Sequence, residues 1–260
     1  MAYENLFHKE VADGIYLIST DSSGPNEDGR SMLPGKATTN SYLIIGKEQA
    51  LLFDLAVDEH GVKEYAEALA GKPVMLVISH CHYDHVFYME LFSDAWLHEM
   101  DAPLLDGSLF GTRKIEPCPK LHYLKHADVI DLGERRLDVI HVPGHTPGSI
   151  LLLDRKTRVL LSGDTGARRF LFGVTPSVSL DVLCDGLEKL QAYPFDIMYS
   201  AHDRCGIPKC HIATMLDVIR NELPHTERVV PVPDAGIMLC ANRGSEEDIS
   251  YFDVAVLTRE

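Results

Sequence analysis

Short apolar runs bounded by turn residues make up most of the chain, and their length favours strands over helices. Runs of this kind predict strands at 11–18, 40–45, 50–54, 74–79, 95–98, 136–142, 150–153, 159–161 and 197–200. Three further runs near the end predict short strands, including a closing hairpin, at 229–232, 236–240 and 252–257. A chain with this many short strands must bury them in sheets.

Helical periodicity is confined to a few segments between these strands. The clearest lies at 60–69, where Gly71 and Pro73 end the apolar pattern. Similar patterns predict two more helices and two short helical segments, at 179–192, 211–222, 86–91 and 100–105. Because strands alternate with helices, the chain falls in the α/β class, with parallel pairing of the strands on either side of the first helix.

Composition and charge are those of an ordinary soluble protein and exclude some partners. The 260 residues, 45% hydrophobic and 24% charged, can bury the core of one domain, which we place at residues 1–260. The formal net charge of −15 repels phosphate backbones, so nucleic acid is not an expected partner. A small-molecule substrate is expected instead, and a homodimer is left open.

Targeting features and cysteine usage point to a cytoplasmic protein. The chain shows no apolar stretch near the roughly 18 residues that a membrane span needs, and the first ten residues lack a secretory signal. The six cysteines follow no disulfide-framework spacing, which predicts reduced thiols. Cys205 and Cys210 flank a short turn, and this pair leaves open a second metal clip.

The densest group of chemically active side chains directly follows the apolar run 74–78. His80, His82, Asp84 and His85 fall within six residues there. Side chains two positions apart on an extended chain project to the same side, so His80 and His82 can reach one ion. Asp84 and His85 can then reach a neighbouring point. Imidazole and carboxylate groups are ligands of zinc and related metals, so the spacing predicts a metal site.

Three more candidate donors, His145, Asp164 and His202, each follow a predicted strand. Strand ends hold functional groups rigidly, and one or two ions need about four to six donors. We therefore expect these three side chains to converge with the first group.

Together these motifs resemble those of the metallo-β-lactamase fold superfamily. The matching stretches are His-x-His-x-Asp-His, Gly-His-Thr-Pro-Gly-Ser, Ser-Gly-Asp-Thr and Ala-His-Asp, at 80–85, 144–149, 162–165 and 201–203. They follow the family's order over residues from about 10 to 205, and their spacing resembles its glyoxalase II-like branch. The resemblance implies an αββα sandwich of two mixed β-sheets flanked by helices, with the metals in the groove between the sheets.

The resemblance also implies a role for each matching position. Two divalent metal ions are expected, most simply Zn²⁺ with Fe or Mn as alternatives. The implied ligands are His80, His82 and His145 for one ion, Asp84, His85 and His202 for the other, and Asp164 as the bridge. Asp84 and Asp164 are accordingly the candidate catalytic residues, although the main role expected of Asp84 is ligation.

Other candidates lie around these ligands. In the family an aspartate at the position of Asp54 orients a ligand histidine through its outer ring nitrogen, the alternative being a turn residue. A loop is expected at 166–177, and its Arg168 and Arg169 either clamp an anionic group of the substrate or lie solvated.

Two other segments have no strand or helix pattern. The stretch 20–39 is either a surface loop or a flap over the metals, and 106–121 is expected at the mouth of the site.

The implied reaction is hydrolysis, with a metal-bridging hydroxide attacking a thioester, ester or lactone carbonyl. No helical glutathione-binding region like that of glyoxalase II is visible after His202, which disfavours glutathione conjugates. Ala167 stands where related lactonases carry a tyrosine. The alternative interpretation is an oxidoreductase resembling the persulfide dioxygenases, which use a single iron.

Overall fold

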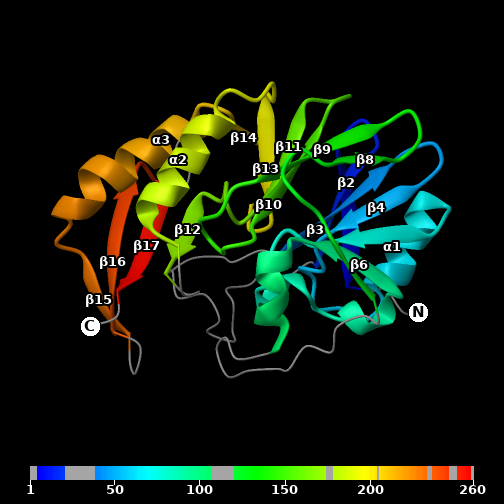
Figure 1. Cartoon of the computed structure of the whole chain (residues 1–260), viewed down its shortest axis with the longest axis horizontal. Coiled ribbons are helices and arrows are strands. Elements are labelled where there is room, and N and C mark those ends of the chain that lie inside the picture. Colours follow the sequence, from blue (N-terminus) through cyan, green and yellow to red (C-terminus); the bar gives the residue numbers. More distant parts are fainter. Residues whose placement is uncertain are drawn as a thin grey trace.

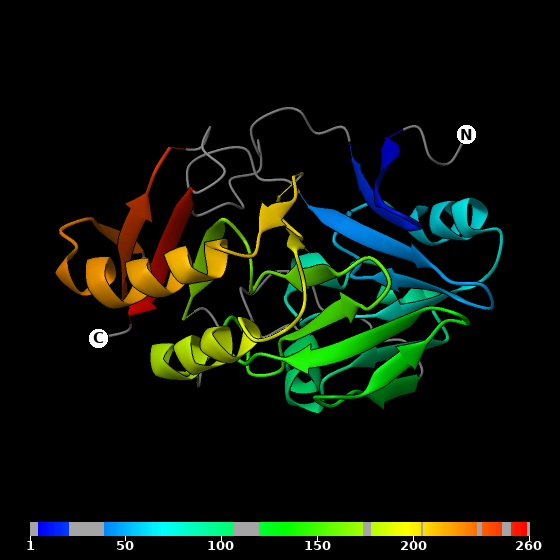
Figure 2. The same ribbon diagram turned by 90° about the horizontal axis from the view of Figure 1, so that it is seen from above.

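The computed structural model describes residues 5–20, 39–106, 120–173, 178–203, 205–232, 236–245 and 251–258. These residues form three sheets with helices on their outer faces (Figures 1 and 2). Most of the two segments without a predicted pattern, 20–39 and 106–121, lies outside the described residues. The expectations of a flap and of a site mouth in those segments stay predictions.

The first sheet has seven strands, in the order β1 (Leu6–Ala12), β2 (Ile15–Thr20), β3 (Asn40–Ile45), β4 (Ala50–Phe53), β5 (Val74–Val77), β6 (Asp94–Leu97) and β7 (Lys120–Tyr123). Strands β1 to β4 pair antiparallel, whereas β4 to β7 pair parallel. The helix α1 (Val62–Ala70) connects β4 to β5, which confirms the predicted strand–helix–strand unit.

The single strand predicted at 11–18 is wrong. Two antiparallel strands, β1 and β2, occupy this part of the chain and are separated by the Asp13–Gly14 turn. Gly14 has a φ of +66°, a left-handed conformation that glycine adopts at little cost. The Asp-Gly pair is a recognised hairpin signal, so the sequence did contain the information.

The second sheet has six strands, in the order β14 (Ile207–Pro208), β13 (Ile197–Ser200), β11 (Val159–Gly163), β10 (Ile150–Asp154), β9 (Arg136–His141) and β8 (Val129–Asp131). Only β11 and β13 pair parallel, and α2 (Leu180–Leu190) lies between them in the chain. Ser179 caps α2 by accepting a hydrogen bond from the backbone N–H of Val182.

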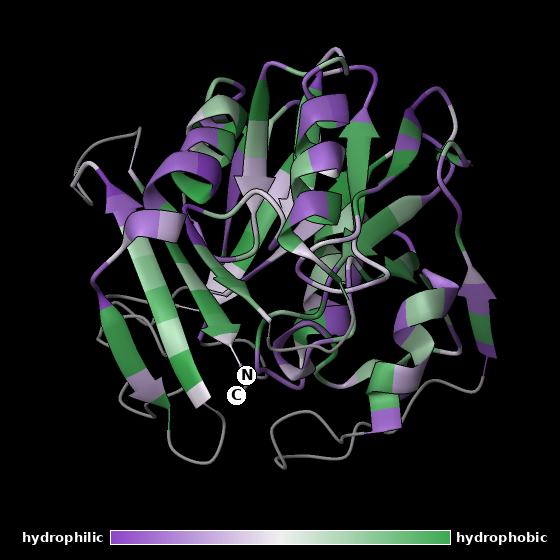
Figure 3. Cartoon of the chain, turned by 60° about the vertical axis from the view of Figure 1, so that its left-hand side comes forward, coloured by the Kyte–Doolittle hydropathy of each residue, from purple (hydrophilic) through white to green (hydrophobic). Residues whose placement is uncertain are grey.

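The two sheets face each other and share a hydrophobic core. Alternate residues of both sheets fill it, among them Leu17, Phe53, Val77, Val139, Leu152 and Leu161. The outer face of the first sheet packs on α1, and the outer face of the second packs on α2 and α3 (His211–Asp217). Figure 3 shows interior strands that are mostly hydrophobic and helices with mixed faces. This arrangement confirms the αββα sandwich.

Several helical predictions need correction in detail. The helix predicted at 86–91 is reduced to one 3₁₀ turn, η2 (Met89–Leu91), and a separate turn, η1 (Tyr83–His85), precedes it. The helix predicted at 100–105 is a 3₁₀ segment, η3 (Glu99–Asp106). The helix predicted at 211–222 begins as α3 and continues as a π-helical turn, η4 (Val218–Glu222), followed by η5 (Leu223–His225). No helix of the described residues combines the length and apolarity needed to cross a membrane.

A third, four-stranded sheet joins the end of the chain to its middle. Its order is β12 (Arg169–Phe172), β17 (Phe252–Thr258), β16 (Gly236–Arg243) and β15 (Val229–Val232). The three predicted tail strands are confirmed, and β16 and β17 form the closing hairpin. The loop predicted at 166–177 is wrong in part, because Arg169–Phe172 pairs parallel with β17. Phe170 and Phe172 pack with α2 and α3 in the same hydrophobic cluster.

His211 is a buried histidine that links α3 to this third sheet. It is 1% exposed and packs edge-on against the ring of Phe252, with 5.4 Å between ring centroids. Burial, helped by the nearby charge of Arg168, lowers its pKa from 6.5 to about 4. A neutral buried histidine stabilises the fold only while the unfolded chain is also unprotonated.

His211 should therefore make the protein lose stability in mild acid. The unfolded chain takes up a proton near pH 6.5 and the folded chain only near 4, so this contribution is complete above 6.5 and falls between those values. The difference between these two pKa values corresponds to about 3 kcal/mol in the free energy of unfolding. Urea unfolding from pH 7 to 4 should show a smaller pH dependence for His211→Phe than for the unaltered chain. The exposed His225→Phe is the matched control, and an equal slope in all three proteins would contradict the assignment.

Candidate metal centre

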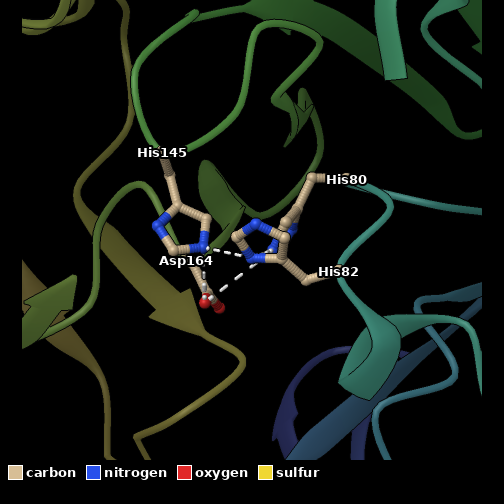
Figure 4. A group of neighbouring side chains, drawn as sticks. All are labelled: His80, His82, His145 and Asp164. Carbon is tan, nitrogen blue, oxygen red and sulfur yellow. Dashed lines mark hydrogen bonds and ion pairs between the residues drawn. The ribbon is translucent and has the colours of Figure 1, made fainter. Parts of the chain in front are cut away.

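Seven polar side chains from four separate strand ends converge between the two main sheets. One group comprises His80, His82, His145 and Asp164, whose donor atoms all lie within 4.8 Å of one another. The second comprises Asp84, His85 and His202, within the same limit. Figure 4 shows the first group with its imidazoles and carboxylate turned toward one point. The predicted convergence is therefore present, whereas ligation itself belongs to the proposal below.

Distances within the first group match the spacing of ligands around a small cation. His82 Nδ1 lies 3.1 Å from His80 Nε2 and 2.8 Å from His145 Nε2. Asp164 Oδ2 lies 3.2 Å from His145 Nε2 and 3.9 Å from His80 Nε2. Nitrogen ligands 2.0–2.1 Å from a tetrahedral ion would be about 3.3 Å apart, so these four atoms surround a volume of the right size.

Asp164 also borders the second group. Its Oδ1 lies 3.2 Å from His85 Nε2, and its Oδ2 lies 3.2 Å from His202 Nε2. Asp84 Oδ2 lies 3.7 Å from His202 Nε2. A carboxylate with one or both oxygens between two sets of imidazoles is placed to contact two ions at once.

Hydrogen bonds to the outer ring nitrogens fix which atoms face inward. Ser79 Oγ donates to Asp54 Oδ2 at 2.7 Å. Because its one proton is used there, Ser79 Oγ accepts from Nδ1 of His80 at 2.9 Å. Nδ1 of His85 donates to Asp54 Oδ2 at 3.0 Å. Nδ1 of His145 donates to the Leu171 carbonyl at 2.7 Å. In all three imidazoles Nε2 is left as the atom that faces the cluster.

Asp54 therefore orients two histidines, one directly and one through Ser79. It is 1% exposed and has a φ of +64°, an uncommon conformation for a residue other than glycine. Its Oδ1 accepts from the Ser79 backbone N–H at 2.6 Å. Backbone strain of this kind is kept where the surrounding contacts over-determine it, and here those contacts hold the histidines.

The cluster attracts positive charge. Burial, followed by the neighbouring histidines, lowers the pKa of His80 and His82 well below 6.5, so both imidazoles are neutral at pH 7. Burial also opposes a charge on His202, but Asp164 and then Asp84 outweigh it and raise its pKa to about 9. Protonated His202 then neutralises Asp164 in place of a metal, so metal binding should release protons.

Buried polar atoms in the cluster fit a divalent cation. His85 Nε2 and Asp164 Oδ1 are inaccessible to solvent, and neither has a hydrogen bond of normal geometry to the described residues. An orphaned imidazole nitrogen facing an orphaned carboxylate oxygen is costly unless both bind a common partner. Neutral imidazoles and carboxylates are the donor set that zinc, iron and manganese use.

Arg168 follows Asp164 by four residues, and two hydrogen bonds hold its backbone in place. Its N–H donates to Asp203 Oδ2 at 3.0 Å, and its carbonyl accepts from the Asp253 N–H at 2.9 Å. Its guanidinium carbon lies 5.5 Å from the centroid of the Tyr251 ring, and Nη1 lies 4.0 Å from Cys205 Sγ. The chain thus places this arginine next to the loop that carries His202.

Arg169 begins β12 and lies opposite Asp253, near the start of β17. Burial raises the pKa of Tyr251 and Asp253, and the charge of Arg169 partly offsets this effect in both. Neither arginine belongs to the two donor groups, so a role in holding substrate stays a proposal. Cys205 and Cys210 are exposed and join no cluster of three donors among the described residues, which leaves the second metal clip unsupported.

Sequence reasoning missed the residues that hold the histidine loops. The sequence marks Ser79 only as the end of a strand, although it directly precedes the first ligand candidate. Ser200 Oγ donates to Asp203 Oδ2 at 2.6 Å and accepts from the His202 N–H at 3.2 Å, which fixes the loop after β13. The only available signal was position, because each of these residues lies within two of a candidate ligand.

Comparison with known proteins identifies the family. A family model described as the metallo-beta-lactamase superfamily matches residues 34–202. A probable metallo-hydrolase of Bacillus subtilis is 28% identical over 146 residues, which are 52% of this chain and 69% of that protein. An acyl-coenzyme A thioesterase of Gallus gallus is 29% identical over 194 residues, 63% of this chain and 66% of that protein.

A further relative, a hydroxyacylglutathione hydrolase of Aeromonas hydrophila, is 32% identical over 159 residues, 57% of this chain and 56% of that protein. The chain therefore spans between 56% and 69% of the length of these relatives.

Solved structures show the same fold. A metallo-beta-lactamase from Pontibacter korlensis has a TM-score of 0.66 at 16% identity and covers 83% of this chain and 99% of its own. A metallo-beta-lactamase family protein from Thermus thermophilus has a TM-score of 0.62 at 20% identity, covering 83% and 84%. The family model covers more than half of the chain, so this protein belongs to the metallo-beta-lactamase superfamily and is an enzyme of the hydrolase kind found there.

Proposed function

We propose that the chain is a binuclear metal-dependent hydrolase in which hydroxide attacks the carbonyl carbon of a small thioester, ester or lactone and the acyl carbon–sulfur or carbon–oxygen bond breaks. The observation that carries the proposal is the convergence of seven donors, with ring nitrogens oriented inward by hydrogen bonds to their outer nitrogens. Bound divalent ions at such a site would supply hydroxide near neutral pH, by lowering the pKa of water from about 15.7 towards about 7, and would polarise the carbonyl.

The chain's own residues set the geometry of this reaction. Asp164 lies between the two groups of donors and would hold two ions at a fixed separation. The side chains of Asp84 and His202 are each 23% exposed, whereas those of His80 and His85 are at most 1% exposed. The cluster is therefore open to solvent on the Asp84 and His202 side, and substrate would enter there.

A thioester is the first substrate class to test. The relative from Gallus gallus is named an acyl-coenzyme A thioesterase, and the relative from Aeromonas hydrophila is named a hydroxyacylglutathione hydrolase. The thiolate that leaves a thioester is stabilised by a nearby cation, and the proposed site offers two. Arg168 lies next to the loop that carries His202, and from there it would bind an anionic part of the substrate.

Metal analysis combined with a substrate panel tests the proposal. The chain should hold two divalent ions and hydrolyse thioesters faster than phosphodiesters, and removal of the ions by a chelator should abolish turnover. Zinc-, manganese- and iron-loaded protein should be compared on thioesters, lactones and esters. One iron per chain with oxygen uptake on a persulfide would instead support the dioxygenase alternative and overturn hydrolysis.

The arginine clamp can be tested with paired substrates. Replacing Arg168 and Arg169 together by glutamine should raise KM for anionic thioesters by about 10-fold, the effect of losing one charge-assisted hydrogen bond. Neutral esters should be affected less than about twofold. The exposed pair Arg155→Gln and Arg158→Gln is the control. Equal losses on neutral and anionic substrates would show that these arginines support the third sheet and do not contact substrate.

A further inference from the structure

A buried carboxylate outside the donor cluster connects two of the loops that form the cluster. These loops carry His80, His82 and His145. Asp101, in η3, is fully buried. Its Oδ2 accepts from the Cys81 backbone N–H at 3.0 Å and from Thr146 Oγ1 at 2.7 Å. Its Oδ1 accepts from the Gly148 backbone N–H at 2.6 Å. One side chain thus receives hydrogen bonds from two segments 65 or more residues apart in the sequence.

Two of the groups that donate to Asp101 belong to neighbours of candidate metal ligands. Cys81 lies between His80 and His82, and Thr146 directly follows His145. Asp101 therefore holds the backbone of the loop after β5 against the loop between β9 and β10. These two loops carry His80, His82 and His145, and His82 Nδ1 lies 3.1 Å from the first loop's His80 Nε2 and 2.8 Å from the second loop's His145 Nε2.

The Gly-His-Thr-Pro-Gly-Ser stretch is adapted to this contact. A Cβ at Gly148 would lie 2.5 Å from Asp101 Oδ1, so only glycine allows the loop to approach the carboxylate. Thr146 Oγ1 donates to Asp101, so the hydroxyl of Ser149, 2.8 Å away, must donate to Thr146 Oγ1. Ser149 Oγ in turn accepts from the Thr146 backbone N–H at 3.1 Å.

A carboxylate is needed because every group that faces it is a donor. Burial raises the pKa of Asp101, while the hydrogen bonds from Thr146, Cys81 and Gly148 act in the opposite direction. An uncharged amide would turn its NH₂ group toward one of these donors and leave a buried N–H without an acceptor. An apolar side chain would leave three donors unsatisfied.

We infer that Asp101 is a positioning residue that sets the metal affinity of the site formed by His80, His82 and His145. It touches no reacting atom and acts by fixing the distance between two loops. This inference rests on the proposed function, because it assumes that these histidines bind a metal ion.

The experiment isolates one ion. A His202→Ala background removes a donor of the other group only, and Zn²⁺ affinity is then measured by competition with a chromophoric chelator. Asp101→Asn should weaken binding by about 10- to 100-fold, as loss of an outer partner of a metal ligand typically does. Thr146→Val removes a single donor and should weaken binding less. Glu99→Gln, an exposed change on the same 3₁₀ segment, is the control.

The outcomes separate positioning from a general structural role. In a His82→Ala background, where the affected site is already lost, Asp101→Asn should leave the affinity of the remaining site within about twofold. Equal weakening of Zn²⁺ binding in both backgrounds would overturn the inference in favour of general destabilisation. Unchanged affinity in the His202→Ala background would overturn it too, because Asp101 would then have no effect on the site. Should Asp101→Asn not fold, Thr146→Val decides by the same comparison. If the unaltered chain binds no ion, the proposed function itself fails.

Discussion

Replacing Asp164 by asparagine is expected to lower kcat by more than about 100-fold and to reduce the metal content from two ions to one. Loss of an outer partner of a metal ligand already costs up to about 100-fold, and Asp164 lies among the donors themselves. Its oxygens are 3.2 Å from nitrogens of His85, His145 and His202, so this carboxylate lies between the two groups of donors. Elemental analysis and steady-state kinetics on a thioester measure both effects.

Asparagine keeps the size of the side chain and removes its charge. The neighbouring histidines, His202 first, hold the pKa of Asp164 well below its usual range despite burial, so the charged form is present at any pH of interest. Asp138→Asn, on β9 and away from the cluster, is the matched control. Full activity of Asp164→Asn with two bound ions would show that the carboxylate does not bridge them.

Local patterns predicted which side chains converge, because four of the seven candidate donors lie in one short stretch of sequence. His80, His82, Asp84 and His85 lie within six residues, and the alternation of an extended chain already separates Cys81 from its neighbours. The structure agrees, since Cys81 is buried in the hydrophobic cluster on the outer face of the first sheet. The alternation of strands and helices gave only the α/β class, and the αββα arrangement was implied by the resemblance of these motifs to the metallo-β-lactamase superfamily.

Non-local contacts were the part that sequence patterns could not supply. Strand β12 is four residues long, and its partner β17 lies about 80 residues later, so no window of sequence contains both. The contact that β12 makes with the site is also non-local, because the Leu171 backbone carbonyl accepts from His145. The identity of the Leu171 side chain does not predict that hydrogen bond. Asp101 was missed for the same reason, since its three donors come from other segments.

Replacing Asp54 by asparagine is expected to weaken binding of the ion held by Asp84, His85 and His202 by about 10- to 100-fold. The carboxylate Oδ2 accepts from Nδ1 of His85 and from Ser79 Oγ, and through Ser79 it also orients His80. An amide offers one acceptor oxygen in place of two, so one of the present donors loses its partner. Isothermal titration with Zn²⁺ at fixed pH measures the change.

Asparagine is the informative substitution because it separates hydrogen bonding from backbone strain. Asp54 has a φ of +64°, and asparagine tolerates that conformation better than most residues, so the strand end should keep its shape. Asp54→Ala removes the same acceptors and adds strain, so its metal-free form should unfold at a lower temperature than that of Asp54→Asn. Ser79→Ala removes the hydroxyl that links Asp54 to His80 but keeps the hydrogen bond from His85 to Asp54, so it should weaken the ion of His80, His82 and His145 more than the other. The weakening is expected because a histidine without its outer acceptor is free to rotate or to present the wrong nitrogen to the ion. If Asp54→Asn binds both ions as tightly as the unaltered chain, Asp54 serves only the turn at the end of β4.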